Sequence, residues 1–177
     1  MEKSIVVFCS SSYTIDPKYN AVAREFVRKA SEKGFIIVSG GTVKGTMGEI
    51  SDELHRCGGK HVGILPKFMK GLEYQDVDEL VWVDTMSVRK EMMRQGTCAA
   101  VALPGGIGTL DELMETLTLR KLKQYDGDIF VLNADGFYDP LADLLDYYVK
   151  TDMLDAASRA LIRFPRTVDE LIGMLEK

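Results

Sequence analysis

The stretch CAAVALPGGIGTLDELMETL, residues 98–117, joins an unbroken apolar run to a glycine-rich corner and then to a helical pattern. The run CAAVAL (98–103) is continuous rather than alternating, which is typical of a strand covered on both faces. The helix that follows is expected to run from Thr109 to about Gln124. A strand that leads directly into a helix is the repeating unit of a parallel sheet. This stretch therefore predicts an α/β fold.

The same unit recurs along the chain. Five further apolar runs are IVVFC (5–9), FIIVSG (35–40), HVGIL (61–65), LVWVD (80–84) and DIFVLN (128–133). Helices are expected to begin at Asp16-Pro17, after Gly45, near Ser87 and at Asp139-Pro140, and Thr167 with Glu170 makes a capping box for the last helix. With 177 residues and neither a linker nor a repeat, we expect one Rossmann-like domain spanning 1–177. Its parallel sheet should carry helices on both faces.

Composition excludes several classes of function. The net charge is −5 and no basic run occurs, which argues against a nucleic-acid partner. The apolar stretch near the N-terminus is too short for a signal peptide or a membrane span. Cys9, Cys57 and Cys98 have neither disulfide-framework nor metal-ligand spacing, so we expect buried reduced thiols in a cytoplasmic protein. The nine methionines are interpreted as core filler.

The corner LPGGIGT (103–109) suits an anion. Gly105, Gly106 and Gly108 let backbone N–H groups crowd together at a helix start, where exposed amides and the helix dipole attract negative charge. A simple tight turn is the alternative. Thr109 and Glu112 also fit an S/T-x-x-E capping box, which would explain the acids of this helix without any chemistry.

Two other loops follow predicted strands. In SGGTVKGTMG (39–48), Thr46 stands where a Walker loop needs lysine, so an ATPase loop is not indicated. The dinucleotide fingerprint G-x-G-x-x-G is also missing after the first strand, which argues against a nicotinamide dehydrogenase. In MSVRKEMM (86–93), Ser87 is the expected N-cap, and Arg89 and Lys90 in the first turn would oppose the helix dipole. They fit either a neighbouring anionic ligand or an exposed, solvated pair.

Taken together, these residues resemble the LONELY GUY family of cytokinin-activating phosphoribohydrolases, often labelled lysine decarboxylases. PGGIGTLDE matches the family pattern PGGxGTxxE, with its glutamate at Glu112. MSVRK lies where the family has MHERK, so the resemblance places the family's arginine at Arg89, while Ser87 and Val88 replace His-Glu. SGGTVKGTMG, FCSSS (8–12) and LNADGFYDPL (132–141) also resemble family segments.

The resemblance implies hydrolysis of the N-glycosidic bond of adenosine 5′-monophosphate (AMP) or its N6-modified, cytokinin-type forms, giving free base and ribose 5-phosphate. It implies catalytic roles for Arg89 and Glu112, a homodimer, and neither a metal nor a cofactor. We expect the substrate to be bound by Gly40, Gly41, Gly45, Arg89, Lys90, Gly105, Gly106, Ile107, Gly108, Thr109 and Thr118. Two alternatives remain open: a nucleotide-binding module that senses its ligand without cleaving it, and an N-ribosyl hydrolase or transferase for another base.

Overall fold

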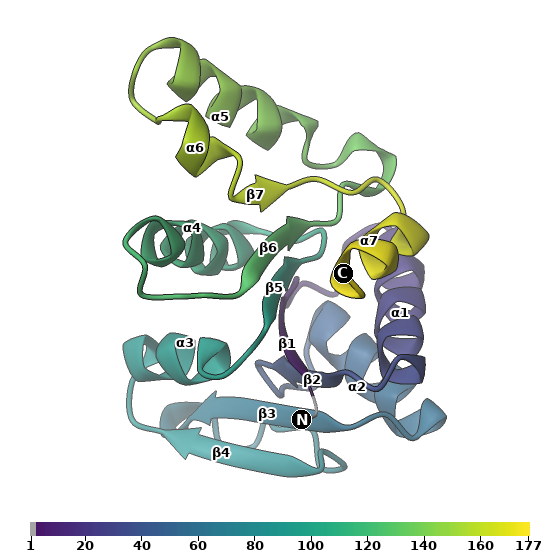
Figure 1. Ribbon diagram of the computed structural model, residues 1–177. Helices are drawn as coiled ribbons and strands as arrows, with labels where there is room; N and C mark the ends of the chain where they lie inside the picture. The colour runs from purple at the N-terminus through teal and green to yellow at the C-terminus, as the bar shows by residue number, and fades with distance from the viewer. Residues whose placement is uncertain (1–2) are drawn as a thin grey trace.

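The computed structural model describes residues 3–177, and these form a single α/β domain around one seven-stranded parallel sheet (Figure 1). The strand order is β4-β3-β2-β1-β5-β6-β7. The bounds are β1 Ser4–Phe8, β2 Ile36–Ser39, β3 His61–Pro66, β4 Glu79–Val83, β5 Ala99–Ala102, β6 Asp128–Val131 and β7 Ile162–Arg163. The six expected strands and the Rossmann-like fold are confirmed, and the two-residue edge strand β7 is an addition.

Helices cover both faces of the sheet, as expected. One face packs against α1 (Pro17–Glu32), α2 (Gly45–Cys57) and α7 (Val168–Leu175), and the other against α3 (Met86–Arg94), α4 (Ile107–Lys121) and α5 (Asp139–Lys150). Short turns complete the chain: η1 (Lys67–Met69), η2 (Ala134–Gly136) and α6 (Ala156–Arg159). In Figure 1, α5 and α6 lie together beyond edge strand β7. The two cores meet at β1, whose side chains alternate between them.

Local signals place most helix ends. Asp16 caps α1, because its Oδ1 accepts a hydrogen bond from Lys18 N at 3.0 Å, and proline occupies the first helical position. Gly58 ends α2 in the left-handed conformation, at φ 69°. Thr167 Oγ1 accepts from Glu170 N at 3.2 Å, which confirms the expected cap of α7. The Glu170 carboxylate accepts a hydrogen bond from Arg166 N at 2.7 Å, and not from Thr167 N as a complete capping box would require.

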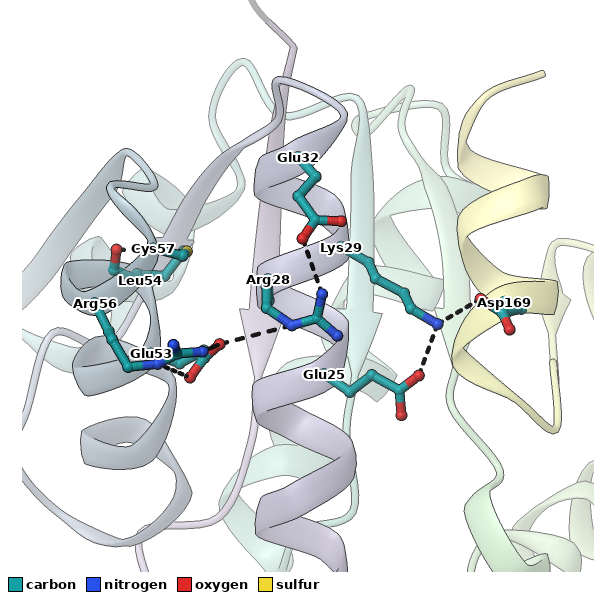
Figure 2. A network of polar contacts seen from close by, with 9 residues as sticks. All are labelled: Glu25, Arg28, Lys29, Glu32, Glu53, Leu54, Arg56, Cys57 and Asp169. Atoms are coloured by element: carbon teal, nitrogen blue, oxygen red, sulfur yellow. Dashed lines mark hydrogen bonds and ion pairs between the residues drawn. The ribbon is translucent and has the colours of Figure 1, made fainter.

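Charged side chains tie α1 to its two neighbours, as Figure 2 shows. Lys29 Nζ lies 2.6 Å from Asp169 of α7 and 2.7 Å from Glu25 on its own helix. Arg28 Nε lies 3.8 Å from Glu53 Oε1 of α2. The Lys29 contacts are partly exposed and contribute little to the free energy of unfolding, whereas Glu53 is buried and holds its charge against Arg28.

Candidate active site at the carboxyl edge of the sheet

A cavity of about 470 Å³ opens at the carboxyl ends of the central strands. Its walls come from residues 9–12 after β1, Gly40 after β2, Arg89 of α3, and residues 106–109 and Glu112 of α4. The strand order reverses here, because the chain leaves β1 toward β2 on one side and later returns to pair β5 on the other. Open α/β sheets bind ligands at such switch points. The volume lies within the range of roughly 300–1,000 Å³ that is usual for small-molecule sites.

Arg89 reaches this cavity from the second turn of α3. Thr85, not the expected Ser87, caps the helix: its Oγ1 accepts from Val88 N at 3.2 Å. The helix therefore begins two residues earlier than the sequence suggested. Arg89 N makes the first i to i−4 bond, to Thr85 O at 3.0 Å. The conflict with the helix dipole is accordingly weaker than expected, because that effect fades beyond the first turn.

Two backbone carbonyls hold the Arg89 guanidinium, which is 6% exposed. Its Nε donates to Ile64 O at 2.9 Å, and its Nη2 donates to Gly40 O at 3.2 Å. A Cβ on residue 40 would lie 2.1 Å from that Nη2. Any residue larger than glycine would therefore collide with the guanidinium in this position. Burial lowers the pKa of Arg89, and the charge of Glu112 opposes that change.

A buried polar pair supports the turn that presents Gly40 O. Ser39 Oγ accepts from Gly41 N at 3.1 Å and lies 2.7 Å from His61 Nε2. Burial lowers the pKa of His61 to about 4, so the ring is neutral near pH 7. In the neutral ring Nε2 either accepts from the Ser39 hydroxyl or donates to it, so the contact is a hydrogen bond with either tautomer. This chain of bonds fixes the turn on which Arg89 rests.

Glu112 is not a capping residue. The helix α4 has Gly106 as its N-cap, without a side-chain cap, and no acidic residue occupies its first turn. The expected box from Thr109 to Glu112 is therefore wrong: the helix begins before Thr109, whose Oγ1 is buried and has no partner among the residues described. Burial is the largest influence on Glu112 and raises its pKa to about 7, against the opposing charge of Arg89. A carboxyl group poised near neutrality suits proton transfer.

The fold does not require glycine at positions 106 and 108. A Cβ at either position would meet nothing within 4 Å, and neither residue has a positive φ. The first backbone bond of α4 runs from Leu110 N to Gly106 O, at 3.1 Å. The N–H groups of residues 107–109 precede it and can bind a ligand. The expectation of an anion-binding corner is consistent with this arrangement.

The remaining predicted substrate-binding residues lie elsewhere. Gly41 and Gly45 are buried behind the loops, and Gly105 lines an adjoining pocket. Lys90 Nζ contacts Asp111 at 3.0 Å and Glu115 at 2.6 Å. Together with Thr118, Lys90 lines a shallow hollow on the outer side of α4. These geometries leave Lys90 and Thr118 outside the cavity.

Sequence reasoning missed several cavity residues. Four methionines line the cavity: Met69 and Met86, which were expected in the core, and Met47 and Met93, which do pack in the core but also reach the cavity wall. Methionine occurs in cores and ligand sites alike, so composition could not separate the two roles. Residues 10–12 also line it, and their position directly after the central strand was a usable signal.

The thiols depart from expectation as well. Cys9 is buried in the cavity wall, but Cys57 and Cys98 are exposed, so buried thiols were predicted correctly for only one of three; all are free. Within residues 3–177, no helix is long and apolar enough to cross a membrane. The same residues contain no group of three or more His, Cys, Asp or Glu side chains arranged to hold a metal ion.

Another hollow, of about 620 Å³, lies between α3 and α4 and includes Arg94, Glu115 and Tyr125. It extends to Gly96 and Thr97, just before β5. That end of the strand is the amino edge of the sheet, where parallel sheets do not place their ligands. We therefore assign the candidate site to the smaller cavity.

Known proteins are similar to this chain in sequence and in fold. A family model described as "Possible lysine decarboxylase" matches residues 47–175. The cytokinin riboside 5′-monophosphate phosphoribohydrolase LOG2 of Arabidopsis thaliana is 35% identical over 178 residues, covering 99% of this chain and 83% of that protein. The phosphoribohydrolase LOG of Oryza sativa subsp. japonica is also 35% identical, covering 99% of this chain and 73% of its own length.

Solved structures agree on the architecture. The molybdenum cofactor carrier protein of Chlamydomonas reinhardtii superposes with a TM-score of 0.76 at 18% identity, covering 99% of this chain and 97% of that one. The molybdenum cofactor binding protein of Rippkaea orientalis gives 0.75 at 20% identity, with coverages of 99% and 97%. At such identities the likeness establishes the fold alone. The full-length sequence match to the plant proteins goes further, and the chain belongs to the LONELY GUY family of lysine decarboxylase-like proteins.

Proposed function

We propose that this protein hydrolyses the N-glycosidic bond of AMP or of N6-modified adenosine 5′-monophosphates, releasing the base and ribose 5-phosphate. The observation that carries the proposal is the meeting of Arg89 and Glu112 in one cavity beside the glycine-rich start of α4. Relatives named cytokinin riboside 5′-monophosphate phosphoribohydrolases support the same reaction.

The 5′-phosphate would bind at the start of α4. Residues 107–109 line the cavity, their N–H groups precede the first hydrogen bond of the helix, and the buried Thr109 hydroxyl has no partner among the described residues. Glycine at positions 106 and 108 leaves space for a ligand at the backbone. Helix N-termini of this kind bind phosphate well.

Glu112 would act on the sugar. It lies one helical turn beyond the phosphate site, close to the place where the anomeric carbon of a bound nucleotide would lie. As the C1′–N9 bond breaks, its electron pair leaves with the base and positive charge develops on the ribose. The Glu112 carboxylate stabilises that charge and accepts the proton of the attacking water, while the departing base takes up a proton from solvent and leaves neutral. Arg89 orients the sugar phosphate relative to the carboxylate.

The base would lie along the methionine-lined part of the cavity. Met47, Met69 and Met86 offer an adaptable apolar wall, which suits a flat purine and a bulky apolar group on its N6 atom. This wall supports adenine-type bases and cytokinin-type bases equally.

The test measures release of free base by chromatography from AMP, N6-isopentenyl-AMP and adenosine, with lysine as a control substrate because of the family model's description. We expect turnover of the monophosphates and a far lower kcat/KM for adenosine, because remote binding energy positions the sugar. Glycine-to-alanine changes at 106 and 108 should leave the Tm near the wild-type value and weaken AMP binding. Binding without base release would favour the sensing module instead.

A homodimer completes the proposal. Helix α4 buries Leu113 and Leu117 in the core, and a second, outer apolar stripe of Ile107, Leu110 and Met114 lines an open hollow, where Leu110 and Met114 are only partly covered by that core. Ile107 is 85% exposed. A helix that is apolar on two faces normally has both faces covered, and a second copy of this chain is the proposed cover.

A further inference from the structure

A second cavity, of about 300 Å³, lies on the other side of the glycine corner. Tyr19, Ile15, Phe137 and Pro104 make it largely apolar. Ser10, Ser12 and Gly106 line both this cavity and the one that holds Arg89 and Glu112. Two chain segments, the loop after β1 and the start of α4, therefore lie between the two hollows, at the point where a phosphate is proposed to bind.

A constrained turn presents Phe137 to this second cavity. Asp135 and Gly136 have φ values of 53° and 72°, so two consecutive residues are left-handed. Asn133 locks the turn: its Oδ1 accepts from Tyr138 N and its Nδ2 donates to Asp139 Oδ1, both at 2.7 Å. Strained backbone of this kind persists where its surroundings over-determine it, and it concentrates at ligand sites.

The same turn is fastened to the glycine corner. Tyr138 OH donates to Leu103 O at 2.8 Å, one residue before Pro104. Phe137 itself stays 38% exposed and meets Tyr19 edge-on, with ring centroids 5.1 Å apart. Two aromatic rings, one of them half exposed, thus flank the segment that lines the phosphate site. Such rings bind flat or apolar groups.

The proposed position of the nucleotide decides which chemical group the second cavity could bind. With the phosphate at residues 107–109 and the sugar beside Glu112, the base remains in the first cavity. Only a substituent on the phosphate can extend past Gly106 into the second. Ligands at a switch point commonly span both sides of the central strand. Among the described residues 3–177, Asp16 is the one charged residue that lines the second cavity, and its charge disfavours a further phosphate and favours an uncharged group.

We propose that this second cavity binds an aromatic or apolar group carried on the 5′-phosphate, so that the protein accepts nucleoside 5′-phosphate esters as ligands in addition to simple monophosphates. The inference rests on the phosphate position given under the proposed function. It also gives a role to the LNADGFYDPL segment, which supplies Phe137 and the turn that holds it.

Calorimetry of ligand binding tests the inference without requiring turnover. The probes are AMP, its methyl ester and its phenyl ester, because the two esters carry the same charge and differ only in the apolar group. We expect the phenyl ester to bind about tenfold more tightly than the methyl ester, on the scale of burying one ring. Equal affinities of the two esters for the wild-type protein would overturn the inference.

Variants locate the effect. Phe137→Ala should reduce the preference for the phenyl ester to about twofold or less, and Phe137→Leu, which keeps apolar volume, should give an intermediate value. Tyr147→Ala, on the exposed side of α5, should keep the full preference. A preference that survives Phe137→Ala overturns the subsite. Binding of AMP with exclusion of both esters overturns the subsite alone, whereas no binding of any probe overturns the proposed function as well.

Discussion

Glu112 carries a carboxyl group whose pKa burial raises from 4.5 to about 7. In the unfolded chain the group ionises around its ordinary pKa. Between about pH 4.5 and 7, therefore, the folded state binds more protons than the unfolded state. The stability linked to the neutral carboxyl is fully present below pH 4.5 and is lost as the pH rises through 7. The loss amounts to roughly 3 kcal/mol, so the ionised form is held in the cavity at a cost to the fold.

Replacing Glu112 with glutamine removes that cost. Glu112→Gln should raise the Tm at pH 8 and change it little at pH 5, because the amide stays neutral at both values. Base release should fall by about two to four orders of magnitude, the scale of losing one acid–base group. Melting curves at the two pH values, beside a chromatographic assay, check both parts. A Tm difference that does not depend on pH would contradict the buried, titrating carboxyl.

The rate should follow the same ionisation. If the carboxylate form works, kcat/KM rises with pH through a midpoint of about 7 in the free enzyme. The substrate phosphate titrates around pH 6 and adds its own limb. Profiles of the wild type and of Glu112→Gln separate the two, because only the substrate's limb should persist in the variant. A limb near pH 7 that is still present in the variant would assign it to another group.

At the scale of elements, sequence periodicity predicted the six longer strands and the helices between them, because each buries an apolar face. It failed where local chemistry is ambiguous. Thr85 and Ser87 can each cap a helix, and only packing against β3 and β4 selects Thr85. Thr109 and Glu112 match a capping box by letters, but the helix begins at Ile107. A two-residue strand such as β7 has no periodicity to detect.

The residues of the candidate site could be picked out from the sequence more readily than their contacts could. The glycine corner, Arg89 and Glu112 stand out by residue type and position. From its place in the sequence, Lys90 was expected to bind phosphate. In the structure it forms ion pairs with Asp111 and Glu115 of α4, and those contacts depend on how α3 packs against α4. No local pattern reveals such a pairing between two helices.

The turn after β2 gives an element-scale prediction. Gly40→Ala would place its Cβ against the Arg89 guanidinium and displace it by about an ångström, a shift that can cost on the order of 10²-fold in rate. Gly173→Ala is the matched control, because a Cβ there meets open space within α7. We expect kcat/KM to collapse only in the first variant. Comparable activity of both variants would show that the position of Arg89 is not critical.

At the scale of the whole molecule, the outer stripe of α4 sets the expected assembly. Met114→Glu puts a charge in the middle of that stripe and should convert a dimer to a monomer, with some loss of Tm because Met114 also packs against the core. Leu144→Glu on α5, which is also an exposed apolar position, should leave the dimer intact. Light scattering after size-exclusion chromatography gives the mass. A monomeric wild-type protein would exclude the dimer directly.

The position of β1 has a consequence for how the chain is made. Val6 of β1 pairs with Val38 on one side and with Ala100 on the other. During synthesis one edge of β1 can be covered early, but the other must wait until β5 leaves the ribosome, more than ninety residues later. Until then the nascent chain carries an open, strongly apolar strand edge, which invites aggregation. The glycine-rich corner at residues 103–109 emerges immediately after the strand that closes this gap, so the candidate site can form only once the sheet is continuous.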